Sequence, residues 1–332
     1  MIMRQEKYGN LKRGILGLAV PIVAVGLLIA GPGGQGKVSA KSKVVYKCVT
    51  PKEPQSSDLK VRHTVTKLKN KRWIQSYTKD DRYYYYIQAT NPYKGHLTIT
   101  RVKYKGLGKY SRAYMYLRYF GHATNLDCSV SNGVTYLWTG SNAVKGKDTS
   151  RAISAFPFQK NAKLYYQSNI MYQIPYDGKG KYVTNVYPAI SADGTELTVR
   201  YTRNNMQYYQ TYPLSQGLYI DPSAPTSLLV TPPTKGAFQG FDVKDAHVYT
   251  IEGSPRKSFL RGYDRRRKYE PTKVRIINKY TGIRTCFTIH GAKRLSFREP
   301  EGIKIQQDGQ LEMMYVSHKL KNMRANIYLI KR

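Results

Sequence analysis

One pattern recurs five times along this chain of 332 residues and restricts its fold more than any other feature. Each copy has a short strand, in four cases opened by a polar residue, then a tight turn and a second strand rich in β-formers. Asn-Gly and Asp-Gly between alternating segments are typical of β-hairpins, because both central residues can adopt positive φ. The five turns are Asp80-Asp81, Asn132-Gly133, Asp193-Gly194, Asp245-Ala246 and Asp308-Gly309.

The spacing of these turns indicates a β-propeller. They begin at residues 80, 132, 193, 245 and 308, so successive copies lie 52, 61, 52 and 63 residues apart. This exceeds the roughly 40–50 residues of a common propeller blade and leaves room for loops. No helical period extends over a dozen residues. We therefore predict an all-β chain that forms a five-bladed β-propeller of four-stranded blades. The alternative, a pair of β-sandwiches, would place turns about every 8–12 residues without a longer period.

Strands can be assigned to most of each repeat. The first strands are predicted at Trp73–Tyr77, Asn125–Ser129, Pro188–Ser191, Gln239–Val243 and Glu301–Ile305. The strands after the turns are Tyr83–Ile87, Val134–Trp138, Glu196–Tyr201, His247–Ile251 and Gln310–Val316. Further strands are predicted at His96–Tyr104, Ala113–Tyr119, Lys163–Tyr172, Lys273–Asn278 and Arg284–Ile289. The last strand, Ala325–Ile330, needs a partner to close the ring, and Val61–Lys67 is our candidate.

The N-terminal residues are typical of a secretory signal peptide. Basic residues precede an unbroken apolar run from Gly14 to Ala30, and Val38-Ser39-Ala40 resembles a cleavage site. We predict a signal peptide over residues 1–40, a basic segment over 41–72 and the propeller domain over 73–332. The alternative is an uncleaved anchor, but the run of seventeen residues is shorter than the roughly 20 that a spanning helix needs. Both interpretations place the rest of the chain outside the cytoplasm.

Charge is the second constraint. The chain has 55 Lys and Arg against 20 Asp and Glu, a formal net charge of +35. Removing residues 1–40 takes away five basic residues and one acidic residue and leaves +31, far above the magnitude of about 2–8 that solubility asks of a small domain. We expect an exported protein this basic to bind anions, namely wall polymers such as teichoic acid, acidic glycans or a target-cell envelope. Nucleic acid is not expected, because export and the missing motifs argue against it.

The basic residues gather in three clusters, interleaved with tyrosine. The densest cluster is our candidate polyanion site and contains Arg256, Lys257, Arg261, Arg265, Arg266, Arg267 and Lys268. The other two are Lys60, Arg62, Lys67, Lys69, Lys71 and Arg72, and Arg101, Lys103, Lys105, Lys109 and Arg112. Arginine can donate two parallel hydrogen bonds to one phosphate, whereas lysine acts as a point charge. For any single cluster the alternative is solvated surface charge. Tyrosine supplies 31 of the aromatic residues, and its flat face and hydroxyl suit sugar-binding surfaces and half-exposed sheets alike.

The first strand of each propeller blade lines a central channel. At the aligned position near the start of these strands the chain has Gln75, Asn125, Pro188, Gln239 and Glu301, and His122 lies three residues before Asn125. The polar members predict a ligand site for a sugar, a phosphate or an ion, formed by Gln75, His122, Asn125, Gln239 and Glu301. The alternative is a water-filled channel whose amides pair with one another.

Glu301 is also the candidate catalytic residue. Glu299 and Glu301 share one face of a strand, and two carboxylates about 5–5.5 or 6.5–9.5 Å apart hydrolyse glycosides. Pro300 separates them, so we expect only one to face the channel, and a single buried or salt-bridged Glu is the alternative. The six histidines show no metal-ligand spacing and no cofactor motif occurs, so neither metal nor cofactor is expected.

The three cysteines, Cys48, Cys128 and Cys286, cannot all pair within the chain, because their number is odd. The sequence leaves open which of them, if any, form a disulfide.

Short motifs in the last two repeats resemble the helveticin J family, the large, heat-labile bacteriocins of lactobacilli. They are Phe238–Val243, Glu299–Ile305, Tyr315–Lys319 and Ala325–Tyr328, together with Gly121-His122-Ala123 before the second repeat. The resemblance covers residues 236–330 best. It implies a propeller-like fold and an antibacterial or cell-surface role. The chain departs from the family in its more basic balance and its predicted leader.

The favoured function is therefore a secreted, strongly basic wall-binding protein of the bacteriocin type, held at the cell surface by charge and expected to be a monomer. The alternative is a cell-wall glycoside hydrolase that acts on peptidoglycan, with Glu301 as general acid or base in the channel.

Overall fold

The computed structural model describes residues 59–66, 68–71, 73–103, 112–168, 170–173, 183–254, 271–319 and 322–330. Within these ranges there are 21 strands and two single-turn 3₁₀ helices, η2 (Pro92–Lys94) and η3 (Tyr166–Ser168). The predicted signal peptide lies outside the described residues. No helix in the described ranges has the length and apolar character needed to cross a membrane.

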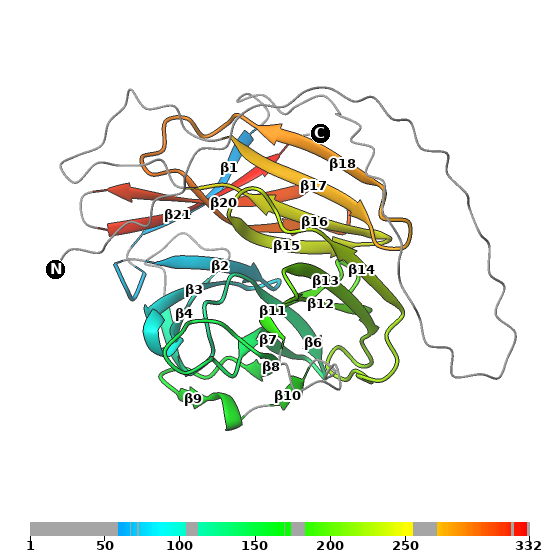
Figure 1. Cartoon of the computed structure of the whole chain (residues 1–332). Helices are drawn as coiled ribbons and strands as arrows, with labels where there is room; N and C mark the ends of the chain where they lie inside the picture. Colours follow the sequence, from blue (N-terminus) through cyan, green and yellow to red (C-terminus); the bar gives the residue numbers. More distant parts are fainter. Residues whose placement is uncertain are drawn as a thin grey trace, which may run out of the picture. The chain divides into compact units, whose positions relative to one another are not determined.

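The strands form five sheets, blades I to V (Figure 1). Blade I contains β2 (Ile74–Lys79), β3 (Tyr83–Asn91), β4 (His96–Lys103), β5 (Arg112–Arg118) and, at its outer edge, β9 (Lys163–Tyr165). Blade II contains β6 (Leu126–Ser131), β7 (Val134–Ser141), β8 (Ala152–Pro157) and β10 (Ile170–Gln173). Blade III contains β11 (Thr184–Ile190), β12 (Glu196–Arg203), β13 (Met206–Pro213) and β14 (Ser227–Thr231). Blade IV contains β15 (Phe238–Lys244), β16 (His247–Glu252), β17 (Thr272–Asn278) and β18 (Arg284–Ile289). Blade V contains β19 (Glu299–Ile305), β20 (Leu311–Lys319), β21 (Asn322–Ile330) and β1 (Leu59–Val65).

The inner strands of the five blades form a closed ring. Each of β2, β6, β11, β15 and β19 contacts the next, and β19 contacts β2. This confirms the predicted all-β, five-bladed propeller. The ring closes where β1 pairs antiparallel with β21, with Leu59 opposite Ile330 and Val65 opposite Ala325. The strand therefore begins two residues before the predicted closing partner, and the propeller includes part of the basic segment that we predicted over residues 41–72.

Glycine is needed at two kinds of position. Asn132 and Gly133 have φ angles of 48° and 74°, so the β6–β7 hairpin uses the turn that its Asn-Gly dipeptide predicts. Gly302 has a φ of 139° beside a bulge in β19, and a Cβ there would lie 3.1 Å from the Tyr77 ring of β2. A side chain at Gly302 would be strained by this backbone angle and would press on the Tyr77 ring.

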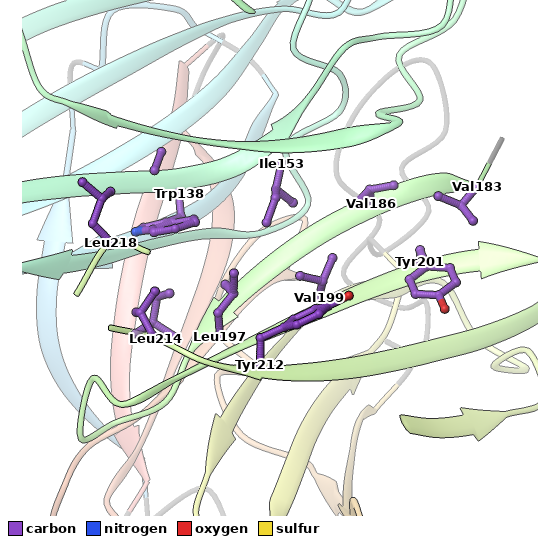
Figure 2. Packing of buried hydrophobic residues seen from close by; sticks show 12 residues of the cluster. Trp138, Ile153, Val183, Val186, Leu197, Val199, Tyr201, Tyr212, Leu214 and Leu218 are labelled. Atoms are coloured by element: carbon purple, nitrogen blue, oxygen red, sulfur yellow. The ribbon is translucent and has the colours of Figure 1, made fainter. Parts of the chain in front are cut away.

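Apolar side chains fill the spaces between blades. Between blades II and III, Trp138 of β7 and Ile153 of β8 pack with Leu197 of β12 and Tyr212 of β13 (Figure 2). The Trp138 indole N–H donates to Ser129 Oγ at 2.8 Å, so its polar atom is satisfied inside the core. Residues that alternate along each strand thus supply two cores, one on each face of the blade.

One strand prediction was wrong, and three strands were not predicted. The predicted strand Lys163–Tyr172 is broken: β9 joins blade I, η3 interrupts the chain and β10 joins blade II. The polar residues Gln167 and Ser168 mark the break. We did not predict β8, β13 or β14, because they are short or carry small and polar residues instead of a clear alternation.

Candidate functional site

The channel has two polar mouths. The N-terminal mouth, where the inner strands begin, contains Gln239, Glu299, Glu301 and His122. Gln239 and Glu301 are buried, and Gln239 Nε2 donates to Gly253 O at 3.0 Å and to Glu299 Oε1 at 3.3 Å. His122 is more exposed, and its Nδ1 lies 2.5 Å from Asp148 Oδ2. The structure thus places three of the five predicted channel residues at this mouth.

The carboxyl groups of Glu299 and Glu301 lie close enough to influence each other's pKa. The register shifts between Pro300 and Ile303, and this bulge breaks the simple alternation of β19. Burial raises the pKa of Glu301 well above its ordinary value, and the charge of Glu299 raises it further. The protonated form of Glu301 is thus favoured in the folded chain.

Glycoside hydrolysis uses one carboxylic acid and a separate carboxylate about 5–5.5 or 6.5–9.5 Å away. Glu299 and Glu301 instead interact with each other, and burial raises the pKa of both.

We expect Glu301→Gln to flatten the pH dependence of stability. Between the ordinary value of 4.5 and the raised pKa, folded Glu301 holds a proton that the unfolded chain releases, so stability falls as pH rises. One such proton contributes about 1.4 kcal/mol per pH unit. Gln keeps the shape and a donor for Glu299 but does not titrate. Urea denaturation at pH 5, 6 and 7 should show a shallower slope for Glu301→Gln than for the wild type, because buried Asp242 still contributes a slope in both. Asp81→Asn, at an exposed carboxyl, should keep the wild-type slope. Parallel curves for wild type and Glu301→Gln would contradict the raised pKa of Glu301.

Asn125 links three blades at the centre of the ring. Its Nδ2 donates to Pro188 O of β11 at 2.6 Å, and its Oδ1 accepts the Phe241 N–H of β15 at 3.3 Å. Because blades II and IV are not neighbours, this side chain reaches across the channel. Gln75, the remaining predicted channel residue, is buried at a bulge in β2. The Asn125 amide is therefore satisfied by backbone groups of two other blades, and it does not pair with another channel amide.

The C-terminal mouth, where the inner strands end, contains an ion triad that we did not predict. Lys304 Nζ of β19 lies 2.7 Å from Asp127 Oδ2 of β6 and 3.5 Å from Asp242 Oδ1 of β15. All three side chains are buried. Asp127 Oδ2 also accepts the Ile190 N–H at 2.8 Å, and Asp242 Oδ2 accepts the Ile305 N–H at 2.6 Å. Each carboxylate thus bonds to the inner strand of the next blade, and Lys304 joins the two.

A cavity of about 320 Å³ opens at this mouth. Its lining includes Thr78, Asp127, Ser191, Asp242, Lys304 and Gln306. Burial raises the pKa of Asp242 to about 7, with Lys304 opposing and Asp127 reinforcing the shift. The two Asp carboxylates raise the pKa of Lys304 against the effect of burial. Adjacent carboxylate and ammonium groups can pair with a ligand that carries several hydroxyls. A sequence signal existed: Asp127, Asp242 and Lys304 are charged residues inside strands that line a channel.

Two of the three basic clusters adjoin in the structure. Arg112 Nη2 donates to Thr66 O at 3.1 Å, the Lys69 N–H donates to Thr100 Oγ1 at 3.4 Å, and Lys69 Nζ lies 5.0 Å from the Tyr114 ring centroid. These contacts join the segment after β1 to the outer strands of blade I. The predicted polyanion site, Arg256, Lys257, Arg261, Arg265, Arg266, Arg267 and Lys268, lies outside the described residues, as do Lys67, Arg72, Lys105 and Lys109.

No disulfide joins Cys128 and Cys286, and Cys48 lies outside the described residues. The Cys128 thiol donates to Lys79 O at 3.1 Å, and burial raises its pKa to about 12. In the ranges that the structure covers, no group of three or more His, Cys, Asp or Glu side chains could hold a metal ion.

Comparison with known proteins gives distant relatives. No family model matches the chain. Over 218 residues it is 26% identical to the Bacillus subtilis (strain 168) protein named "Putative major teichoic acid biosynthesis protein C", a match of 62% of this chain and 45% of that protein. The tail fibre of Staphylococcus aureus phage P68 is similar in structure, with a TM-score of 0.59 and 15% identity over 82% of this chain and 52% of the fibre. A thermostable family-43 glycoside hydrolase gives a TM-score of 0.43 and 12% identity over 81% of this chain and 90% of the enzyme. The chain thus spans about half the length of the first two proteins, and the structural likenesses concern the fold alone.

Proposed function

We propose that this protein is exported and binds anionic polymers of the bacterial cell wall, such as teichoic acid. The observation that carries the proposal is the way the propeller distributes its charge. Exposed lysines occur on every blade, for example Lys94, Lys147, Lys235, Lys273 and Lys60 on or beside blades I to V. With a net charge of +31 after removal of the predicted signal peptide, the protein is electrostatically suited to a polyanion.

The acidic residues do not offset this surface. Each of the fourteen acids in the described ranges forms an ion pair, holds a turn or belongs to the Glu299–Glu301 pair. The ion-paired acids are Asp81, Asp127, Asp148, Glu196, Asp242, Asp245, Glu252 and Glu312. The turn residues are Asp80, Asp193, Asp221 and Asp308, whose carboxylates accept nearby backbone N–H groups. Because eight of the fourteen acids already face a cation, most of them do little to repel an approaching phosphate polymer.

Two further observations support the wall as the location of this polymer. The N-terminal sequence is typical of a signal peptide. The name of the Bacillus subtilis relative refers to teichoic acid, and that protein matches well over half of this chain. The resemblance to the helveticin J family extends the proposal to antibacterial action against related cells.

The test is binding to purified cell walls before and after removal of phosphodiester-linked polymer with cold hydrofluoric acid. We expect binding to intact walls at low salt and a fall of at least about tenfold between 0.05 and 0.5 M NaCl, because exposed charges are screened. Stripped walls should bind less than about a tenth as much. Poly-L-lysine serves as a control for charge without a fold.

Equal binding to stripped walls, or retention on intact walls in 1 M NaCl, would refute charge-driven recognition of the polymer. The same preparation, applied to growing bacteria, tests the antibacterial part: unchanged viability despite wall binding would leave a wall-binding protein without killing activity.

A further inference from the structure

Exposed aromatic side chains gather at one end of blade I. Four of the six exposed aromatic residues in the described ranges lie there, Trp73, Tyr93, Tyr119 and Tyr165, with 43–71% of each exposed. Trp73 precedes β2, Tyr93 lies in η2 between β3 and β4, Tyr119 follows β5 and Tyr165 ends β9. These termini lie at the same end of the sheet, because β2 to β5 alternate in direction and β9 is parallel to β5. This is the end of the blade at which the inner strand begins.

The backbone turns two of these side chains outward at a conformational cost. Trp73 and Tyr119 have φ angles of 55° and 61°, in the left-handed region that bulky residues rarely adopt. Tyr119 is held there, since its carbonyl accepts the Ala143 N–H at 2.8 Å. The next residue, Phe120, is buried with its ring edge-on to Phe156. Core packing accounts for Phe120 but not for the exposed ring of Tyr119.

Three rings at this end form a connected surface. The centroids of His96 and Tyr119 are 4.8 Å apart with the rings nearly perpendicular, and those of Tyr119 and Tyr165 are 6.4 Å apart. The Tyr119 N–H donates to His96 Nδ1 at 3.3 Å, which leaves the imidazole proton on Nε2. Tyr165 lies on β9, which is between two strands of blade II in the sequence but pairs with β5 of blade I. This extra strand thus adds the third ring to the surface.

Cations flank these rings. Arg118 lies opposite Tyr165 in the pairing of β5 with β9, and Lys163 lies opposite Tyr116. Burial lowers the pKa of His96, and the positive charges of Arg118 and Lys94 lower it further, so both cations lie near its ring. Flat apolar faces, hydroxyls and cations therefore occur together.

We propose that His96, Tyr119 and Tyr165 bind a pyranose substituent of a polyol-phosphate polymer, while Arg118 and Lys94 contact an adjacent phosphate. The apolar face of the sugar packs on the tyrosine rings, and sugar hydroxyls pair with the tyrosine hydroxyls and His96 Nε2–H. Phosphate oxygens accept from the guanidinium and ammonium groups. Because the backbone fixes Tyr119 in advance, little freedom is lost on binding. The inference rests on the proposed function for the polymer and adds a preference for its sugar.

The experiment compares synthetic glycerol-phosphate oligomers with and without glucosyl or N-acetylglucosaminyl substituents by isothermal titration calorimetry. We expect the full chain to bind one or both glycosylated oligomers about tenfold more tightly than the bare oligomer. This preference should persist in about 0.5 M NaCl, because packing against a ring is not screened. The double variant Tyr119→Asn, Tyr165→Ala should lose the preference and still bind the bare oligomer at low salt. Asn is chosen because it tolerates positive φ.

Matched controls are Tyr219→Ala and Tyr280→Ala, which remove exposed tyrosines elsewhere and should keep the preference. Equal binding of all oligomers by the wild type, or an unchanged preference in the double variant, would overturn the proposed sugar site and leave the proposed function intact. Binding of no oligomer would overturn both. If the folded double variant also failed to bind the bare oligomer, these tyrosines would not act through the sugar. That result would overturn the proposed sugar site as well.

Discussion

Replacing Lys304 by Met will destabilise the propeller by about 3–5 kcal/mol at pH 8, the cost of leaving buried charge without its partner. Lys304 Nζ is the cation shared by Asp127 and Asp242, which come from two other blades. Methionine keeps the length and apolar stem of lysine, so the variant removes little besides the ammonium group. Two carboxylates then face each other in a buried site at the centre of the ring. Urea denaturation followed by circular dichroism measures the loss.

The loss will be smaller at pH 5 than at pH 8. Asp242 already has a pKa of about 7 in the presence of Lys304, which lowers it, so removing Lys304 raises it further. A carboxyl whose folded pKa lies above its ordinary value of 3.8 loses stability as pH rises from that value through the folded pKa. At pH 5 folded Asp242 is protonated in the variant, so the site holds one buried negative charge fewer than at pH 8.

Two controls separate charge from packing. Lys273→Met removes an exposed lysine of β17 and should change stability by no more than about 0.5 kcal/mol. The double variant Asp242→Asn, Lys304→Met should be more stable than Lys304→Met at pH 8, because Asn can still accept the Ile305 N–H without a charge. A loss below about 1 kcal/mol for Lys304→Met at both pH values would show that the triad is not a structural link.

The architecture was predictable because its main determinants are local. An Asn-Gly or Asp-Gly turn needs only its own residues and the alternating segments beside it, so the turns at Asn132, Asp193 and Asp308 revealed the repeat. The fifth strand of blade I was not predictable in this way. It depends on a parallel pairing in which Arg118 lies opposite Tyr165, and no turn or period in the sequence marks such a pairing.

The site was only partly predictable, because its contacts join different blades. Asn125 was selected as a channel residue, but its bonds to Pro188 and Phe241 exist only once three blades are in place. The ion triad also depends on contacts between blades, because Lys304 reaches Asp127 and Asp242 only after the ring closes. The Glu299–Glu301 contact depends on a bulge that the alternation of β19 does not show. Residue type indicated polarity in the channel, and only the register and the ring closure determine which polar groups pair.

Replacing Val65 by Asp will destabilise the propeller on the order of 4 kcal/mol, because β1 is part of its core. Val65 is 3% exposed and packs with residues of β2, β3, β20 and β21, among them Ile74, Tyr84 and Met314. It lies opposite Ala325 at the end of the pairing that closes blade V. An aspartate there loses apolar burial between blades V and I and brings a carboxylate into an apolar cluster. Thermal and urea denaturation should show the loss, and limited proteolysis should cleave the variant faster.

Val61→Asp is the matched control, since it makes the same change in the same strand at a side chain that is 54% exposed. We expect it to alter stability by no more than about 0.5 kcal/mol, because the new carboxylate stays in water. If both variants were equally stable, β1 would not close the ring, and the blade-V core would have to be held by β19, β20 and β21 alone. If both were equally unstable, the defect would come from charge on β1 in general, and the inward direction of Val65 would not be the cause.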